Sequence, residues 1–451
     1  MATQMKKQVG FSGLLALSVG LNIGGSLFGL TPVAAGLTGP SLPLALLVSA
    51  LPILLAVLPY AMLSSAAPTT AGSYRYMQLL SPSLALVVVM SGVTCAMIGG
   101  LPLLSQIFGL YLQNLLPINP TISALVVLTL FYVINMVGIR SAMRVQVKLV
   151  LLLVSALALY TFQGATQIEA SRFAEPFPGG IGGLLAAAGL LFTLSVTGLA
   201  VIDLGGEVVD AQRTIPRVLL LGILTAVAIN LSILTVTAGV ADLLTIEGKT
   251  LVDVAVNFMS AAQLRYFVIA GALLACATSI NGLFTLVARW LVILGSEGLL
   301  PRFLSRVDTE RGSAFGGLTL AYVLAALALL TQSSLLFFGT LINFPLMLGV
   351  ALISLLVIIS PHRYPILYER SVFHPPPIIL WAVCGTVIVA NLVIFVFLAS
   401  ASHRATWTFF GMLLVCGLYA ISRRKTLAIL PRIAPAMDTS SSLLTEKTIS
   451  E

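Results

Sequence analysis

The chain has 451 residues, of which 59% are hydrophobic and only 8% are charged, whereas soluble globular proteins carry about 25% charged residues. So few charges cannot cover a water-soluble particle of this size, and the mean hydropathy of +1.08 indicates that lipid replaces polar surface. Disordered and collagen-like classes are excluded as well, because the 38 glycines and 22 prolines are spread through apolar runs without a period of three.

Cysteine and histidine give no sign of a metal or cofactor site. The cysteines lie within apolar stretches, where cysteine behaves as a small buried hydrophobe, and the histidines are far apart in sequence. These residues are Cys95, Cys276, Cys384, Cys416, His362, His374 and His403. We therefore expect no metal, no cofactor and no catalytic residue, and a chain that is not an enzyme.

Long apolar runs predict the architecture, because a membrane-spanning helix needs about 20 apolar residues. On this criterion the chain is an all-α integral membrane protein with about twelve transmembrane segments. They cover residues 11–36, 40–65, 83–115, 120–139, 146–164, 183–204, 216–240, 264–294, 316–331, 334–360, 378–400 and 405–421. The loops between them are too short for a catalytic domain, so we expect the function to lie within the helix bundle.

Basic residues between the segments predict the orientation. With the N-terminus in the cytoplasm, 19 of the 23 Lys and Arg residues fall on the cytoplasmic side. The outer side holds Arg172, Lys249, Arg265 and Arg404. We therefore expect a multi-pass protein of the cell membrane with both termini cytoplasmic. Its net charge of +8 reflects this orientation and indicates no nucleic-acid partner.

Two segments contain helix-breaking residues. In lipid, a broken helix is tolerated only where its freed backbone groups face protein or a polar cavity. The first segment holds Asn22-Ile23-Gly24-Gly25-Ser26-Leu27-Phe28-Gly29, and the sixth holds Ser195-Val196-Thr197-Gly198-Leu199-Ala200 before Asp203. Such small residues also allow close helix packing. Because the breaks are five segments apart, as a five-plus-five inverted repeat requires, they favour a secondary transporter with a central site.

Further motifs follow in order along the chain. They are Ile23–Gly29, Gly72–Tyr76, Glu207–Arg217, and a set formed by Asn281-Gly282, Arg289 and Glu297–Pro301. These stretches resemble the I-G-S-G-I-F-G, G-G-x-Y-x-Y, E-V-K-N-P-x-R-T-I-P-R and N-G … R-x-L-Y-A-M-A-R-D-G-x-L-P motifs of the amino acid/polyamine/organocation (APC) permeases. The resemblance covers residues from about 9 to 365. It implies the LeuT-like fold, with discontinuous helices 1 and 6 and two further helices at the end.

The resemblance also implies a division of the chain. Residues 1–10 are a cytoplasmic N-terminus, 11–164 the first inverted repeat (helices 1–5), 183–360 the second (helices 6–10), 378–421 helices 11 and 12, and 422–451 a cytoplasmic tail. The end of this tail, from about residue 436, is rich in Ser and Thr and is expected to be disordered.

The two breaks suit a zwitterionic substrate. Freed N–H groups at the start of the second half of helix 1 present the positive end of a helix dipole to a carboxylate. Carbonyls freed at both breaks can accept from an ammonium group. The predicted substrate-binding residues are Asn22, Ile23, Gly24, Gly25, Ser26, Leu27, Leu194, Ser195, Thr197, Gly198 and Leu199.

Three residues are candidates for coupling transport to an ion gradient: Asp203, Thr278 and Ser279. Asp203 could take up a proton or hold a cationic group, or it lies in a wet inner vestibule. By resemblance to sodium-coupled relatives, the hydroxyls of Thr278 and Ser279 could bind a sodium ion, although adjacent hydroxyls on an apolar helix also bond to their own backbone. Proton-coupled members often carry a lysine midway along helix 5, where this chain has Leu153. The sequence therefore does not decide whether transport is coupled to protons, coupled to sodium ions or uncoupled.

Two further polar residues have structural interpretations. Glu207 is expected at the cytoplasmic end of helix 6, within reach of arginines. Asn343 could line the pocket, although an interhelical hydrogen bond is the stronger interpretation.

Selectivity is predicted from the residues after Gly198. The family often has an aromatic gate and an acidic residue there, whereas this chain has Leu199 and Ala200. The leading hypothesis is therefore a secondary active permease that moves amino acids, neutral ones first, across the lipid bilayer by alternating access. The alternatives are a cationic amine or polyamine transporter or exchanger that uses Asp203, and a non-transporting sensor or accessory membrane protein. The oligomeric state is not predicted.

Other classes are disfavoured. A channel would need a selectivity-filter motif. A six-plus-six facilitator would need a long central loop after helix 6. A membrane enzyme would need several catalytic side chains at the same depth in the membrane.

Overall fold

The structure is a computed structural model and describes residues 9–137, 143–175, 177–241, 249–308 and 313–429. Within these residues the regular structure is helical, and β-type pairing is limited to two isolated bridges, Val9 with Val208 and Thr70 with Leu204. The α-helices are α1 (Phe11–Asn22), α2 (Gly25–Thr38), α3 (Leu42–Ala66), α4 (Gly72–Leu80), α5 (Pro82–Cys95), α6 (Leu101–Leu112), α7 (Pro120–Val137), α8 (Met143–Ala165), α9 (Gly180–Leu190), α10 (Thr193–Val196), α11 (Ala211–Val240), α12 (Leu251–Ala255), α13 (Ala261–Tyr266), α14 (Leu274–Ser296), α15 (Phe315–Leu330), α16 (Leu335–Arg363), α17 (Pro365–Glu369), α18 (Pro377–Ala401), α19 (His403–Ser422) and α20 (Arg424–Ile429).

Short 3-10 and π-helical turns connect several of these helices. The 3-10 turns are η1 (Gly39–Ser41), η3 (Ala170–Phe173), η4 (Thr197–Asp203) and η7 (Arg302–Ser305), and the π-helical turns are η2 (Ala96–Gly100) and η6 (Phe267–Leu273). The predicted disordered tail and the extreme N-terminus lie outside the described residues.

Among the described residues, nine helical stretches are long and apolar enough to cross a membrane, and two shorter apolar helices accompany them. One stretch, Phe11–Ala66, has 56 residues, more than twice the roughly 20 that one crossing needs. It is divided between α1 and α2 and again at η1. Apolar runs become helices because a helix satisfies its own backbone groups in lipid. The chain is therefore a multi-pass membrane protein, as its composition predicts.

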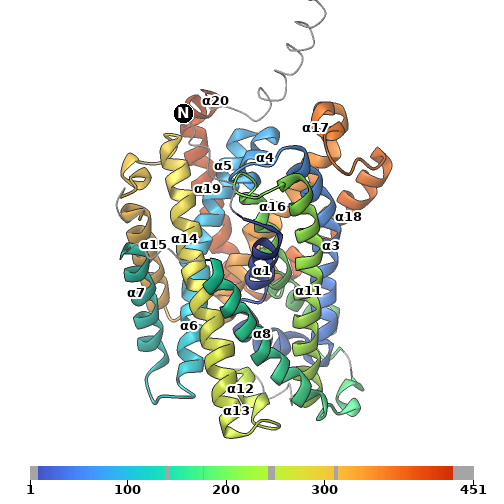
Figure 1. The fold of residues 1–451 in the computed structure, drawn as a ribbon, viewed down its shortest axis with the longest axis vertical. Coiled ribbons are helices and arrows are strands. Elements are labelled where there is room, and N and C mark those ends of the chain that lie inside the picture. The colour runs from blue at the N-terminus through green and yellow to red at the C-terminus, as the bar shows by residue number, and fades with distance from the viewer. Residues whose placement is uncertain (1–8, 138–142, 176, 242–248, 309–312, 430–451) are drawn as a thin grey trace, which may run out of the picture.

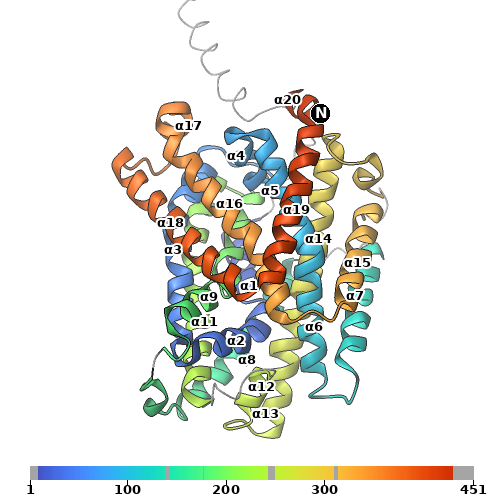
Figure 2. The ribbon, with the colours of Figure 1, turned by 180° about the vertical axis from the view of Figure 1, so that it is seen from behind.

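The helices form one elongated bundle (Figures 1 and 2). α4, α17 and α20 lie at one end, which we call the basic end, whereas α12 and α13 lie at the opposite end. α1 contacts α11 and η4, and α2 contacts α6 and α9. Because most residues of α2 are buried, the junction between α1 and α2 lies inside the protein.

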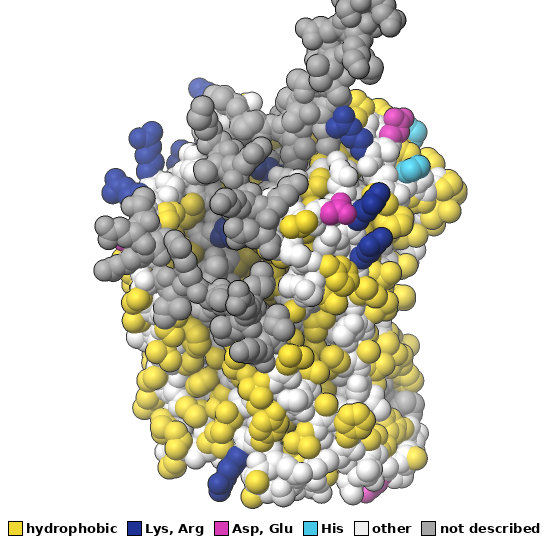
Figure 3. All heavy atoms as spheres, in the orientation of Figure 1, with side chains coloured by type: hydrophobic (Ala, Val, Ile, Leu, Met, Phe, Trp, Pro, Cys, Tyr) yellow, Lys and Arg dark blue, Asp and Glu magenta, His cyan; other side chains and the backbone are white. Residues whose placement is uncertain are grey.

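Charge is distributed unevenly along the bundle. Lys and Arg side chains gather near the basic end, and hydrophobic side chains cover most of the body below it (Figure 3). The elements at the basic end carry Arg75, Arg302, Arg363, Arg370, Arg423, Arg424 and Lys425, and α13 at the opposite end carries Arg265. A lipid-exposed body between two polar ends suits a membrane protein.

Candidate functional site

The helix interruption predicted in the first segment lies at Ile23 and Gly24, which we call the first break. α1 ends at Asn22, and Gly24 is extended (φ −86°, ψ −176°) before α2 begins at Gly25. The N–H groups that open a helix have no partner within it. The N–H of Gly25 donates to Oγ of Ser279 (3.2 Å), and among the described residues no hydrogen bond from outside the helix engages the N–H of Ser26. The break therefore presents the start of a helix dipole inside the bundle.

Glycine is required where α14 approaches the first break. A Cβ atom on Gly25 would lie 2.7 Å from Sγ of Cys276 and 2.9 Å from its Cα atom, and one on Gly24 would lie 2.8 Å from Oγ of Ser279. These distances are shorter than a carbon atom allows. Two adjacent glycines thus let α14 form a wall of the break.

A second interruption lies at Leu191 and Phe192, between α9 and α10, four residues before the stretch predicted from the sequence. A regular α-helix would pair the carbonyl of Leu190 with the N–H of Leu194. Instead, the N–H of Leu194 donates to the carbonyl of Leu191 (2.9 Å), and the carbonyl of Leu190 accepts from Nδ2 of Asn343 (3.0 Å). An asparagine from α16 thus replaces a backbone hydrogen bond, as the interhelical interpretation of Asn343 predicts.

The next turn of this segment is held in the same way. The carbonyl of Leu194 accepts from Nδ2 of Asn230 on α11 (3.1 Å), and the N–H of Gly198 donates to Oδ1 of Asn22 (2.9 Å). The hydroxyl of Thr197 donates to the carbonyl of Leu21 (2.9 Å). The two interrupted segments are therefore joined directly, α1 to η4.

The sequence predicts that the carbonyl of Leu194 accepts from an ammonium group. In the structure this carbonyl accepts one hydrogen bond, from Asn230, and keeps a second lone pair, so the role of Leu194 in binding stays a prediction. The sequence interpretation missed Asn230, although a lone asparagine within an apolar span is a known signal of function or interhelical bonding. Buried polar atoms without a hydrogen-bond partner in these segments and their neighbours include Oγ of Ser18, Nδ2 of Asn22, Oγ of Ser195, and Oδ1 of Asn230 and Asn343.

Apolar side chains complete the surroundings of the first break. Ile23, Leu27 and Leu199 are buried. A Cβ atom on Gly25 would lie 2.9 Å from Cδ2 of Leu104, and a Cβ atom on Gly29 would contact Ile107. The described walls of the break are therefore hydrophobic apart from backbone groups, amides and the hydroxyls of Thr197 and Ser279.

The two hydroxyls predicted as sodium ligands have separate partners. Thr278 donates to the carbonyls of its own helix, Leu274 (2.9 Å) and Ala275 (3.1 Å), whereas Oγ of Ser279 accepts from Gly25. The backbone-bonding interpretation therefore describes Thr278, and Ser279 links α14 to α2.

Asp203 lies at the far end of η4, away from the first break along the chain. Its Oδ1 accepts from the N–H of Ser73 (2.7 Å), and its carbonyl accepts from the N–H of Ala71 (2.9 Å). Asp203 thus fastens η4 to the start of α4.

A group of ionic side chains ties the basic end together. Arg75 pairs with Glu297 (2.7 Å), and Arg289 pairs with Glu207 (3.4 Å), which is the structural role expected for Glu207. The hydroxyl of Tyr74 donates to Glu297 (2.9 Å). Burial and the neighbouring Glu297 carboxylate raise the pKa of Tyr74, so this hydroxyl remains a donor at neutral pH.

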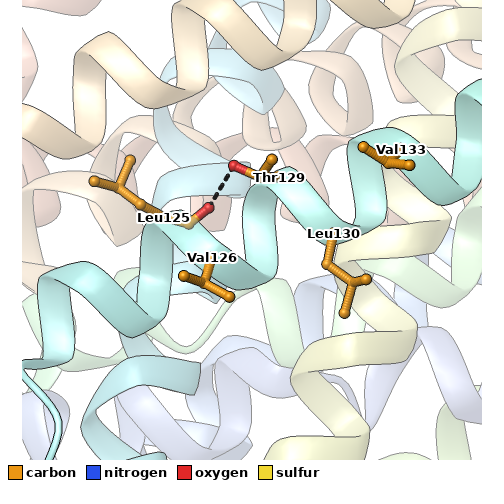
Figure 4. A pocket seen from close by; sticks show the side chains of 5 residues that line it. All are labelled: Leu125, Val126, Thr129, Leu130 and Val133. Atoms are coloured by element: carbon orange, nitrogen blue, oxygen red, sulfur yellow. Dashed lines mark hydrogen bonds between the residues drawn. The ribbon is translucent and has the colours of Figure 1, made fainter.

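A hollow of about 410 Å³ lies on α7, at the flank of the bundle (Figure 4). Its lining is Leu125, Val126, Thr129, Leu130 and Val133. The Thr129 hydroxyl, the polar side-chain group of this lining, already bonds to the carbonyl of Leu125 (2.8 Å) and to the hydroxyl of Tyr322 (3.0 Å). This hollow is a surface feature of one apolar helix.

Comparison with known sequences decides the family. The sequence model described as amino acid permease matches residues 9–419. The chain belongs to this family of amino acid permeases. As a permease it transports amino acids rather than converting them, and its helices cross the membrane many times.

Curated relatives of this permease are distant. It is 23% identical over 394 residues to the branched-chain amino acid permease BcaP of Bacillus subtilis, covering 80% of this chain and 82% of the relative. It is 27% identical over 342 residues to BcaP of Lactococcus lactis subsp. cremoris, covering 68% and 72%. It is 24% identical over 411 residues to the mitochondrial cationic amino acid transporter 3 of Arabidopsis thaliana, covering 82% and 66%.

Proposed function

We propose that this permease carries neutral amino acids with apolar side chains by alternating access and binds them at the first break. The observation that carries the proposal is the start of α2 inside the bundle, together with the unpartnered Nδ2 of Asn22, which ends α1 and lies against Gly198. Both groups are donors suited to a carboxylate. The carbonyls at the end of α1 supply acceptors for the ammonium group.

The charge around the site favours a neutral side chain. No titratable residue occurs from Asn22 to Leu27 or from Leu190 to Ile202, and the carboxylate of Asp203 lies at the far end of η4, where it accepts from the N–H of Ser73. A cationic side chain would enter this site without a counter-ion, which is costly. The apolar contacts of Leu104, Cys276 and Ile107 at the break suit an aliphatic side chain instead. The names of the two bacterial relatives support branched-chain amino acids as the first candidates.

We further propose the LeuT-like arrangement, with inverted repeats at 11–164 and 183–360, helices 11 and 12 at 378–421, and both termini in the cytoplasm of a cell that carries the protein in its plasma membrane. Two interruptions five predicted segments apart support the repeats. The basic end supports the orientation.

Uptake into proteoliposomes tests the substrate. We expect accumulation of radiolabelled leucine, isoleucine or valine and little accumulation of lysine, arginine or putrescine. Preferred uptake of the cationic solutes would replace the proposal with the cationic alternative. If no amino acid is carried or protects the protein against thermal unfolding, the non-transporting alternative gains support.

The same vesicles test coupling when a proton or a sodium gradient is imposed. The Thr278 hydroxyl donates to its own helix and Oγ of Ser279 accepts from Gly25, and both oxygens keep a lone pair for a cation. We therefore propose both hydroxyls as coupling candidates. Stimulation of uptake by an inward sodium gradient would support a sodium site, and uptake that is insensitive to sodium would remove both residues from coupling.

A further inference from the structure

Five basic side chains gather at the basic end, at η7 and at the start of α20. They are Arg302, Arg306, Arg423, Arg424 and Lys425. Arg423 is half-buried and the other four are exposed. Within the described part of the chain, the ion pairs of arginine involve Arg75, Arg172 and Arg289 instead. Among these residues, the positive charge of the group therefore has no carboxylate partner.

One turn brings η7 and α20 together. It covers Glu297–Pro301 between α14 and η7, and the positive φ of Gly298 (+73°) favours glycine there. The hydroxyl of Tyr419 on α19 donates to the carbonyl of Leu299. A Cβ atom on Gly298 would lie 3.9 Å from Cγ2 of Thr426 on α20. α20 lies beside the upper end of α14 in both views of the fold (Figures 1 and 2), so basic residues of two distant segments meet at this turn.

The η7 side of the group is packed by main-chain contacts. A Cβ atom on Gly295 would lie 3.0 Å from the backbone nitrogen of Ser305, and one on Gly316 would lie 2.7 Å from the carbonyl oxygen of Phe303. The end of α14 and the start of α15 therefore hold η7 between them. Arg302 is the first residue of this packed element, so its backbone has a fixed place.

The α20 side is held by one buried and one aromatic residue. Leu427 is 2% exposed, whereas Arg424 and Lys425 on the same short helix are exposed. Nε of Arg423 donates to the hydroxyl of Tyr419 (3.1 Å), and the guanidinium carbon lies 5.3 Å from the centre of the tyrosine ring. The same tyrosine thus holds the turn through its hydroxyl and orients Arg423, whose remaining N–H groups can donate to another acceptor.

Exposed apolar side chains border the basic group. Phe303, Val307 and Ile421 are exposed and belong to the same two segments. These segments, residues 297–308 and 419–429, carry five basic residues but only two acidic ones, Glu297 and Asp308, and Glu297 already pairs with Arg75. Basic groups beside apolar surface at the end of membrane helices suit a molecule with an anionic head and an apolar tail.

We infer that η7 and α20 form a binding site for an anionic phospholipid, which we call the lipid site. Its phosphate accepts from Arg302, Arg423 and Arg424, because guanidinium groups match phosphate oxygens, and its acyl chains lie on Phe303 and Ile421. A zwitterionic headgroup would add a positive charge beside five cations, and a soluble anion would leave the apolar border uncovered. The lipid site is separate from the proposed amino acid site and does not depend on it.

The turn connects the lipid site to the rest of the basic end. Leu299 in the turn is bonded to α19 and Glu297 to Arg75 and Tyr74 on α4. A lipid that bridges η7 and α20 therefore stabilises a junction of α4, α14 and α19. We expect phosphatidylglycerol to raise the melting temperature of the purified permease in detergent more than phosphatidylcholine does.

A tryptophan reporter measures lipid binding at the site itself. Ile421→Trp is made with Trp290, Trp381 and Trp407 replaced by phenylalanine, and the full-length permease is placed in vesicles of phosphatidylcholine and phosphatidylglycerol. Brominated chains on one lipid at a time quench the tryptophan that they contact. We expect phosphatidylglycerol to be preferred about tenfold or more, since each basic residue near an anionic headgroup contributes about fivefold in affinity.

The matched variants remove equal charge from different places. Arg302→Gln with Arg424→Gln should lower the preference for phosphatidylglycerol at least about fivefold. Arg213→Gln with Arg217→Gln is the control, because α11 begins four residues after Glu207 at the same end but on the other flank from α19 (Figures 1 and 2). The control should leave the preference unchanged.

Three results would overturn the inference. The first is equal quenching by the two brominated lipids in the Ile421→Trp protein. The second is an equal fall of the preference in both double variants, which a diffuse surface charge predicts. The third is loss of the preference when inorganic phosphate replaces chloride at the same ionic strength, because the site would then take free phosphate rather than a lipid.

The melting temperature repeats the comparison in the protein with its native tryptophans. Stabilisation by phosphatidylglycerol should be lost in Arg302→Gln with Arg424→Gln and kept in the α11 control. If both double variants keep it, the lipid site is refuted even where the reporter protein does not fold. Both measurements are made without an amino acid, so their outcome is independent of the transport assay.

Discussion

Gly25 combines two requirements in one residue. Its N–H is the first of α2 and bonds to Ser279, and its missing side chain leaves room for the backbone of α14 at Cys276. The proposed site therefore depends on a close approach of main chains, which a larger residue prevents.

Gly25→Ala is expected to reduce amino acid uptake at least tenfold. The added Cβ atom must displace Cys276 and Leu104, and overpacking of this kind costs about 1–3 kcal/mol. Initial uptake rates and substrate protection in a thermal assay measure the effect. Gly36→Ala is the matched control, because Gly36 lies on the same helix with no atom within 4 Å of the new methyl group. Equal loss in both variants would mean that α2 merely tolerates alanine poorly.

At the scale of elements, the segment from α9 to η4 is held in place by side chains. Asparagines from α1, α11 and α16 replace regular backbone bonds on three sides of it. An irregular helix in lipid needs such donors and acceptors from its neighbours. The segment therefore keeps its shape only while α1, α11 and α16 surround it.

Asn230→Ala and Asn343→Ala are each expected to lower the free energy of unfolding by about 1–3 kcal/mol, because a buried carbonyl loses its donor. The melting temperature in detergent measures this change. Asn391→Ala is the control, since both amide atoms of this buried residue lack a partner and its removal should be neutral. A larger loss at Asn391 than at Asn230 would contradict the assignment of these bonds.

The two interruptions differ in how far the sequence could predict them. The first break coincides with Gly24 and Gly25, so composition alone locates it. Leu191 and Phe192 are ordinary helix residues, and the second interruption depends on Asn343 and Asn230 from distant segments. Single-sequence patterns do not reveal which carbonyl a distant amide will reach. For the same reason the sequence does not predict the hydrogen bonds of Tyr111, whose hydroxyl bonds to Phe28 on α2 and to Leu251 on α12.

At the scale of the whole molecule, the apolar body and the two polar ends follow directly from composition. The distribution of Lys and Arg predicts one charged end, and the elements that carry these residues meet there in space. The ion pairs of Arg75 with Glu297 and Arg289 with Glu207 connect sequence-distant segments at that end.

Single exposed cysteines should report the two ends separately. In a background without native cysteines, we expect Ser260→Cys near α13 to react with an impermeant maleimide in intact cells. Gln212→Cys near the start of α11 should react only after the cells are lysed, because basic ends face the cytoplasm. Reaction of Gln212→Cys in intact cells would reverse the proposed orientation.

Glu297→Gln tests the link at the basic end. The amide oxygen can still accept from Tyr74, but the ion pair with Arg75 is lost. Because both side chains are only partly exposed, we expect the loss of unfolding free energy to exceed the 0–1 kcal/mol typical of surface pairs. We also expect Cys276, which lies against Gly25, to react faster with an impermeant thiol reagent applied from the basic end. Arg172→Gln, which breaks an exposed pair with Glu169, should leave labelling unchanged. If Cys276 also reacts at an unchanged rate in Glu297→Gln, the ion pair between Arg75 and Glu297 contributes to stability but does not control access to Cys276.

The stretches from Asn22 to Leu27 and from Leu190 to Ile202 contain no residue that gains or loses a proton. Backbone dipoles and amides keep the same charge distribution at every physiological pH. The protonation of the bound amino acid itself, its amine and its carboxylate, would then govern how affinity varies with pH. A binding curve that follows the titration of the solute in free water is the signature of such a site.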